Sequence, residues 1–123
     1  MHDFRRLKVW ERSRYFARDV ARLTARVRRV DDRITATQLR RSALAIPSLI
    51  CEGCGKRTRA ETVRYLDIAL GSATESEGHL VQAMDLALLP HQECRKLISE
   101  AVQIQRMLHA LMRNLPADPR YDP

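Results

Sequence analysis

Apolar residues recur along this 123-residue chain at alternating intervals of three and four, the spacing that places side chains on one face of a helix. Four such stretches predict helices at about residues 4–32, 35–53, 59–88 and 90–114. Because short links make successive helices antiparallel, we expect an all-α fold, an antiparallel up-down-up-down four-helix bundle. It would form one domain over residues 1–115, and residues 116–123 would be a flexible C-terminal tail.

Local signals mark where the second predicted helix bends and ends. Pro47 lies in its middle, where a proline removes a backbone hydrogen bond, so we expect a kink and, as the less favoured outcome, a break. Gly53 and Gly55 can adopt the left-handed conformation that ends a helix. The third helix is predicted to begin at the capping box Thr58 to Glu61, in which two side chains satisfy backbone donors.

The third predicted helix carries a heptad-like seam with one charged member. The seam consists of Val63, Leu66, Leu70, Ala73, Glu77, Leu80, Met84 and Ala87. We expect Glu77 to pair with an arginine such as Arg41, across the bundle or at a subunit contact. Gly71, Ser72 and Gly78 lower helix propensity, and the close approach of another backbone would explain them. They indicate tight helix or subunit contacts.

The positive charge is concentrated in the first half of the chain. Residues 1–60 hold 16 Lys and Arg against 6 Asp and Glu, whereas residues 61–123 hold 6 against 9, which together give the net charge of +7. If the first helix reaches Arg33, five arginines spaced by four, four, three and four form a stripe opposite its apolar face. The candidate phosphate-binding residues are Arg18, Arg22, Arg26, Arg29, Arg33, Arg40, Arg41, Lys56, Arg57 and Arg59.

Three interpretations of this basic surface stay open. It can be a solvated helix face, which a run of charges usually is, a surface for nucleic-acid phosphates, or a docking surface for an acidic protein. Trp10, Phe16 and Tyr65 are expected in the core or at contacts, so few aromatic rings are left to stack on single-stranded bases. Nucleic-acid binding would therefore consist mostly of phosphate contacts.

The pair Cys51-x-x-Cys54 has the spacing of zinc sites and thiol–disulfide catalysts. The nearest set of four zinc ligands would add His91 and Cys94, which an up-down bundle places at its opposite end. A redox role is disfavoured as well, because the pair lies at a helix C-terminus, where the dipole opposes a thiolate. We therefore expect no metal site, and two small side chains flanking the core.

Other signs of catalysis are weak, and the chain is expected not to be an enzyme and to need no cofactor. Glu75 and Glu77 point away from each other on a helix, and no phosphate-binding loop is present. The histidines have no partner at ligand or triad spacing and are expected at the surface; they are His2, His79, His91 and His109. With no apolar stretch long enough to span a membrane, no signal peptide and three cysteines, we expect a cytoplasmic protein with reduced thiols.

Three ordered motifs follow one another along the chain. The first contains Phe4, Leu7, Val9 and Trp10. The second contains Gln38, Leu39, Arg40, Arg41, Ile46, Pro47, Ser48, Ile50, Glu52, Gly53 and Gly55. The third contains Leu66, Ile68, Ala69, Gly71, Ser72, Glu75 and Glu77. Together they resemble a known family, the four-helix bundle proteins encoded in intervening sequences of large-subunit ribosomal RNA genes. The family consensus is close to F-x-x-L-x-V-W, then Q-L-R-R-A-x-x-S-I-P-S-N-I-A-E-G-x-G-R, then L-x-I-A-x-G-S-x-x-E-L-E.

The resemblance covers about residues 4–112 and implies a helical bundle that assembles as a ring of five. The related accessory variability determinant proteins of diversity-generating retroelements also form such rings. Those relatives are basic and work with nucleic acid and a reverse transcriptase. This sequence departs from the family consensus at several positions, among them Leu49, where the consensus has Asn, and Cys51, where it has Ala. We therefore expect a homopentameric, non-enzymatic protein that binds nucleic acid, with RNA favoured. The alternative is an adaptor that docks an acidic partner such as a reverse transcriptase.

Overall fold

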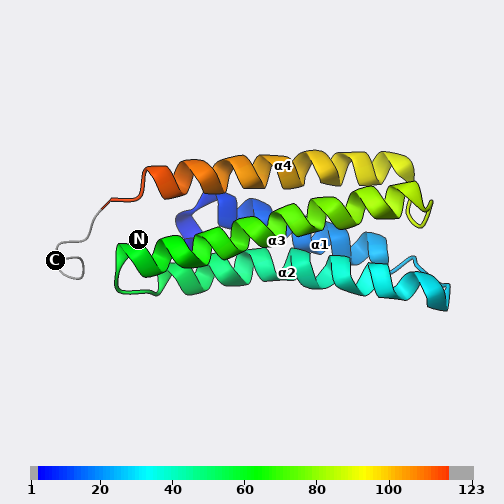
Figure 1. The fold of residues 1–123 in the computed structure, drawn as a ribbon, viewed down its shortest axis with the longest axis horizontal. Coiled ribbons are helices and arrows are strands. Elements are labelled where there is room, and N and C mark those ends of the chain that lie inside the picture. The colour runs from blue at the N-terminus through cyan, green and yellow to red at the C-terminus, as the bar shows by residue number, and fades with distance from the viewer. Residues whose placement is uncertain (1–2, 117–123) are drawn as a thin grey trace.

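The computed structural model describes residues 3–116, which form an all-helical fold with no strand among them. The long helices are α1 (Lys8–Thr24), α2 (Arg33–Cys54), α3 (Arg59–Asp85) and α4 (His91–Arg113), and two short 3-10 helices are η1 (Phe4–Arg6) and η2 (Val30–Asp32). Each long helix ends near the start of the next (Figure 1). The all-α prediction is confirmed, whereas the predicted tail beyond Pro116 lies outside the described residues.

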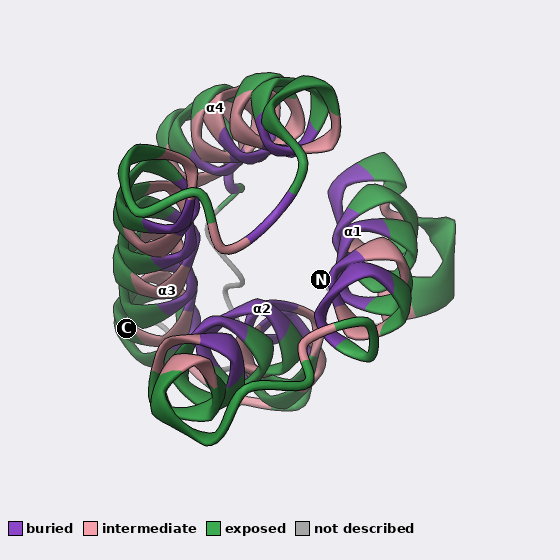
Figure 2. Ribbon diagram, turned by 90° about the vertical axis from the view of Figure 1, so that its right-hand side faces the viewer, coloured by how far each residue is buried: buried purple, intermediate pink, exposed green. Residues whose placement is uncertain are grey.

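The core lies along the axis that the four helices enclose (Figure 2). Its fully buried large side chains include Phe16, Leu39, Ile46, Leu66 and Leu108, so every long helix contributes to it. Helix α1 packs mainly on α2, and its packing against α4 is the least extensive among neighbouring pairs of long helices. No helix in residues 3–116 has the length and apolar character needed to cross a lipid bilayer.

The first predicted helix is wrong at its C-terminal end, because α1 stops at Thr24 rather than near residue 32. The Thr24 hydroxyl donates to the Val20 carbonyl at 2.8 Å, and the Val27 N–H then donates to the Thr24 carbonyl at 3.1 Å in a tightened turn. Asp31 and Asp32 lie just before α2, where carboxylates stabilise a helix N-terminus. The chain therefore reverses where the arginine spacing alone suggested a continuous helix.

The seam predicted for α3 is displaced around the helix. The residues that are buried are Thr62, Leu66, Ala69, Ala73, Ser76, Leu80 and Ala83. Most are small, because α3 is packed between α2 and α4 and its buried face lies in the angle between them (Figure 2). The expected pairing of Glu77 with Arg41 is not found; Glu77 Oε1 instead accepts a hydrogen bond from Gln105 Nε2 of α4 at 2.8 Å.

Helix α2 continues through Pro47 as one element, so the break does not occur, and it does not end on a left-handed glycine. Gly55 has a φ of −86°, and Gly53 is buried against α3. A Cβ atom at Gly53 would lie 3.1 Å from the Cβ of Tyr65. Thr62 Oγ1 donates to the Gly53 carbonyl at 2.9 Å. Gly53 thus allows the end of α2 to approach the start of α3.

Gly71 and Gly78 do not mark close contacts between helices of one chain. A Cβ atom at either position would meet nothing within 4 Å, and both residues are exposed on α3. Of the two explanations for these glycines, a tight contact inside the bundle is therefore wrong.

The predicted N-terminal cap of α3 is present, because Thr58 Oγ1 accepts a hydrogen bond from the Glu61 N–H at 3.1 Å.

Candidate nucleic-acid interface

The five arginines of the predicted stripe do not share a helix face, because α1 ends at Thr24. Arg18 and Arg22 project from α1, whereas Arg26 and Arg29 lie in the connection after it. Arg33 is the first residue of α2. All five are exposed. The structure therefore divides the predicted stripe: Arg18 and Arg22 stay on α1, whereas the other three lie around the turn between α1 and α2.

A groove of about 460 Å³ lies at this end of the bundle, which we call the basic end. It is lined by Arg26, Val27, Arg28, Arg29, Asp32, Leu86, Ala87 and Leu88. Three guanidinium groups face one carboxylate, so the groove attracts anions. Leu86 is 64% exposed at its rim, on the connection between α3 and α4. The connections at two corners of the bundle thus build the groove together.

A second, smaller groove of about 240 Å³ runs between α1 and α4. It is lined by Asp19, Arg22, Leu23, Arg26, Glu93, Lys96 and Leu97. An Arg26 guanidinium nitrogen lies 3.4 Å from Glu93 Oε1, so part of the positive charge here is already balanced. This groove combines an apolar floor with charges of both signs.

The other predicted basic cluster, Lys56, Arg57 and Arg59, lies at the opposite end of the molecule, in the connection between α2 and α3 and at the start of α3 (Figure 1). The 22 residues of α2 separate it from Arg33, which is roughly 33 Å at about 1.5 Å per residue. Lys56 Nζ lies 4.7 Å from the Tyr65 ring centroid, and Arg59 Nε donates to the Leu115 carbonyl at 3.0 Å. The structure does not bring this cluster together with the basic end.

Arg40 and Arg41 are exposed in the middle of α2, away from both ends. Arg41 lines a polar groove of about 450 Å³ between α2 and α3, whose other lining residues are Gln38, Ser42, Ala45, Ser72 and Glu75. These side chains come from the second and third motifs of the sequence, and the two helices bring them together. The ten predicted residues therefore belong to three separate places on the bundle.

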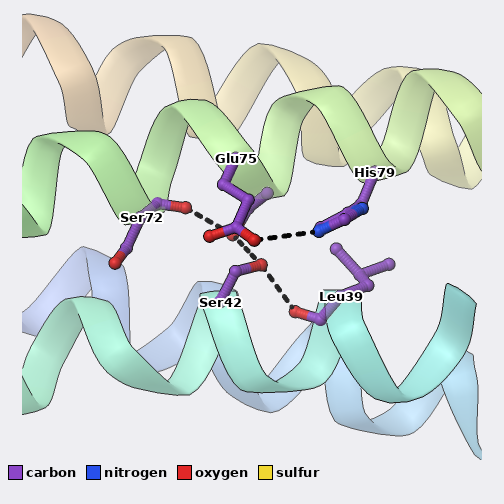
Figure 3. A network of polar contacts seen from close by, with 6 residues as sticks. Leu39, Ser42, Ser72, Glu75 and His79 are labelled. Atoms are coloured by element: carbon purple, nitrogen blue, oxygen red, sulfur yellow. Dashed lines mark hydrogen bonds and ion pairs between the residues drawn. The ribbon is translucent and has the colours of Figure 1, made fainter. Parts of the chain in front are cut away.

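Beneath the polar groove, hydroxyl groups connect the two helices (Figure 3). Ser42 Oγ and Ser76 Oγ are 2.8 Å apart and buried. Glu75 Oε1 lies 3.3 Å from His79 Nε2, and the side chain of His79 is only 13% exposed. His79 Nδ1 is buried and has no hydrogen-bond partner among the described residues. The expectation of a surface histidine is therefore wrong for His79.

The three cysteines are free thiols; Cys54 and Cys94 are buried, and Cys51 is half-buried. Burial, and to a lesser extent the charge of Cys51, raises the pKa of the Cys54 thiol to about 11, and burial also raises the pKa of Cys94. A thiol that keeps its proton is a poor nucleophile and a poor metal ligand. Within residues 3–116, no group of three or more His, Cys, Asp or Glu side chains is arranged to hold a metal ion.

Several residues at these surfaces were not identified from the sequence. Arg28 lines the basic end, and Lys96 adds a cation from α4. Arg14 precedes Arg18 by one helical turn, and Tyr15 lies beside both. The interval of four that links Arg14 to Arg18 was a usable signal in the sequence. The contribution of α4 was not, because it depends on how the helices pack.

Comparisons with known proteins place this surface in context. A family model described as 23S rRNA-intervening sequence protein matches residues 5–110. A crystal structure from Bacteroides thetaiotaomicron, described as a protein with unknown function from the S23 ribosomal protein family, is similar with a TM-score of 0.79 and 22% sequence identity. The match covers 86% of this chain and 99% of that chain, and at this identity it supports the fold alone. No curated protein matches the chain.

Proposed function

Because the chain belongs to the family of 23S rRNA-intervening sequence proteins, we propose that it binds nucleic acid, with RNA favoured, and catalyses no reaction. The proposed working form is a cytoplasmic homopentameric ring of antiparallel up-down-up-down bundles. Arginine and lysine side chains would contact phosphates, and few bases would be read. No cofactor or metal takes part in this proposal.

The observation that carries the proposal is the groove at the basic end. Arg26, Arg28 and Arg29 line it with one carboxylate, Asp32, and the exposed Arg33 follows at once in the chain. Guanidinium groups present a planar fork of donors that fits phosphate oxygens, and neutralising phosphates releases counterions from the nucleic acid. A cluster of such groups on the connection between α1 and α2 therefore favours a polyanion over a small neutral ligand.

RNA affinity measured at two salt concentrations tests this proposal. Counterion release predicts a linear fall of the logarithm of the affinity with the logarithm of the salt concentration. Arg22→Glu combined with Arg29→Glu should abolish binding. The matched control is Arg95→Glu with Arg106→Glu, which changes the net charge equally on the exposed side of α4 and should bind nearly as the natural protein does. No binding even at low salt would refute the proposal.

The proposed ring is supported by apolar side chains that one chain leaves exposed. They include Ile34 and Leu44 on α2 and Ile68 and Val81 on α3. Gly71 and Gly78 leave open space on α3, which another subunit could approach closely. A ring would repeat the basic end and add avidity to weak sites. Light scattering should give a mass of five times the 14.2 kDa of one chain, and a monomer at working concentration would contradict the ring.

The alternative function is an adaptor that docks an acidic protein such as a reverse transcriptase. The groove between α1 and α4 favours it, because Leu23 and Leu97 supply an apolar floor and Arg22 and Lys96 lie beside it. Protein interfaces commonly have such an apolar centre with charges at the rim. Stoichiometric binding of a purified acidic partner, together with no RNA binding at low salt, would favour the adaptor.

A further inference from the structure

A series of alternating guanidinium groups and aromatic rings lies on α1. We call it the α1 ladder and define it as Trp10, Arg14, Tyr15 and Arg18. The guanidinium carbon of Arg14 lies 4.9 Å from the Trp10 ring centroid and 5.2 Å from the Tyr15 ring centroid. The guanidinium carbon of Arg18 lies 4.8 Å from the Tyr15 ring centroid. Two cations therefore flank one tyrosine ring.

The two rings of the ladder differ in how far they are held by the core. Trp10 is half-buried, packs against the core, and meets the Phe4 ring edge-on at a centroid distance of 4.9 Å. Tyr15 is 38% exposed, although the next residue, Phe16, is fully buried. Tyr15 thus projects from a helix that its neighbour fixes in place. A ring held in this way loses little conformational freedom when a ligand stacks on it.

The arginines of the ladder continue toward the basic end. Arg14, Arg18 and Arg22 are four residues apart on α1, so they lie in one row at steps of about 6 Å along the helix axis. A row of cations along one helix can follow the phosphates of a single strand. One acid competes here, since an Arg18 nitrogen lies 3.1 Å from Asp19 Oδ1.

We propose that the α1 ladder binds single-stranded RNA, with an unpaired base stacked on the Tyr15 ring. Arg14, Arg18 and Arg22 contact successive phosphates. This inference depends on the proposed nucleic-acid binding and narrows its ligand to unpaired RNA. A duplex is a poor ligand for the ladder, because its bases are stacked on one another and present no free face to a protein ring. Single-stranded sites elsewhere combine cationic grooves with aromatic rings in the same way.

The test compares a fluorescently labelled oligouridine with an RNA duplex of the same length. Their affinities are measured by anisotropy for the natural protein and for Tyr15→Leu, Tyr15→Phe and Arg14→Gln with Arg18→Gln. Tyr15→Leu should weaken single-strand binding by about tenfold or more, the usual effect of losing one stacked base, and should leave duplex binding within about twofold. Tyr15→Phe should retain binding. The arginine pair should weaken single-strand binding without touching the core.

Trp10 gives an independent readout, because it is the single tryptophan of the chain. Its emission should change when oligouridine draws Arg14 from its ring, and duplex should not cause that change. Equal losses for strand and duplex in Tyr15→Leu, or unaltered binding in both Tyr15→Leu and the arginine pair, would overturn the ladder while nucleic-acid binding stands. Failure of the natural protein to bind either RNA at low salt would overturn the proposed function itself.

Discussion

Arg12 on α1 and Glu100 on α4 form a two-point ion pair across the side of the bundle where the helices have the least contact. Arg12 Nε lies 2.8 Å from Glu100 Oε1, and an Arg12 terminal nitrogen lies 2.8 Å from Glu100 Oε2. The hydrogen bond to Glu100 raises the pKa of Arg12 above its ordinary value. The paired fork geometry fixes α1 against α4 at the level of the α1 ladder, because Arg12 and Arg14 belong to the same turn.

Removing this pair should cause a small loss of stability. Arg12→Gln is expected to lower the free energy of unfolding by about 0.5–1 kcal/mol, since both side chains are partly exposed and salt screens the pair. Urea unfolding at low and high salt measures the effect. Arg12→Lys keeps the charge but loses the fork, and should recover only part of it. If the double-mutant cycle with Glu100→Gln gives no coupling at low salt, the pair contributes nothing.

Replacing two glycines by alanine should change the stability of the fold in opposite directions. Gly53→Ala should destabilise the fold by about 1–3 kcal/mol, because the new methyl group would meet Tyr65 at 3.1 Å and the Thr62 carbonyl at 3.4 Å. Gly71→Ala should stabilise one chain by about 0.5–1 kcal/mol, because alanine is the better helix former and the space is open. Chemical denaturation compares them.

Light scattering on Gly71→Ala adds a second result from the same protein. A stable chain that no longer assembles would place the exposed glycine face of α3 in the ring contact. Unchanged assembly would exclude Gly71 from that contact. Equal destabilisation by both alanines would show that the α2–α3 approach at Gly53 is not specific.

Replacing Ala87 by glycine is expected to stabilise the fold. Its φ is 55°, which is a left-handed conformation, and the Leu88 N–H donates to the Ala83 carbonyl at 2.9 Å in the manner of a helix end that usually carries glycine. Ala87→Gly should raise the free energy of unfolding by about 0.5–1 kcal/mol. Relief of the left-handed strain in the folded state should exceed the cost of the greater conformational freedom that glycine gives the unfolded chain. Ala25→Gly is the control.

Ala25 also caps a helix, but with a φ of −62°. Glycine at that position relieves no strain, so Ala25→Gly should lower the melting temperature whereas Ala87→Gly raises it. A fall in both would mean that Ala87 is not strained in solution.

The Cys54 thiol should be protected at neutral pH and should destabilise the fold in alkali. Burial raises its pKa from an ordinary 9.0 to about 11, so the folded chain holds this proton more tightly than the unfolded chain does. Stability is therefore complete below about pH 9 and declines as the pH rises toward 11. Cys54→Ala should lessen this decline and leave the part that comes from Cys94, while Cys51→Ala should not lessen it. Iodoacetamide at pH 7 should modify the half-buried Cys51 before Cys54, and the reverse order would contradict the burial.

The helices were predictable from the sequence because their apolar spacing is strong, and the bounds of the last three lie within three residues of those expected. The end of α1 was not predictable, since no glycine or proline lies between Thr24 and Arg33 to signal it. That end depends on packing, which turns Val27 onto the core. Because the first helix was predicted to be too long, Arg18 and Arg33 were expected on one helix face, whereas the folded chain places them on α1 and α2.

The buried face of α3 also depended on information outside its own sequence. A single seam suits a helix with one neighbour, but α3 lies between two, and Ser76 rather than Glu77 faces the interior. Tyr15 was not identified from the sequence, where Trp10, Phe16 and Tyr65 were expected in the core or at contacts. Its contacts with Arg14 and Arg18 depend on side-chain geometry that the helical spacing of the sequence does not give.

For the proposed nucleic-acid binding, the separation of the two cationic ends sets a minimum ligand length. At roughly 33 Å between them, a short oligonucleotide reaches one end only. A DNA duplex rises about 3.4 Å per base pair and needs about ten pairs to reach both. Affinity plotted against duplex length should then rise in a step rather than smoothly. The length of α2 would thus determine how long a ligand must be to contact both ends.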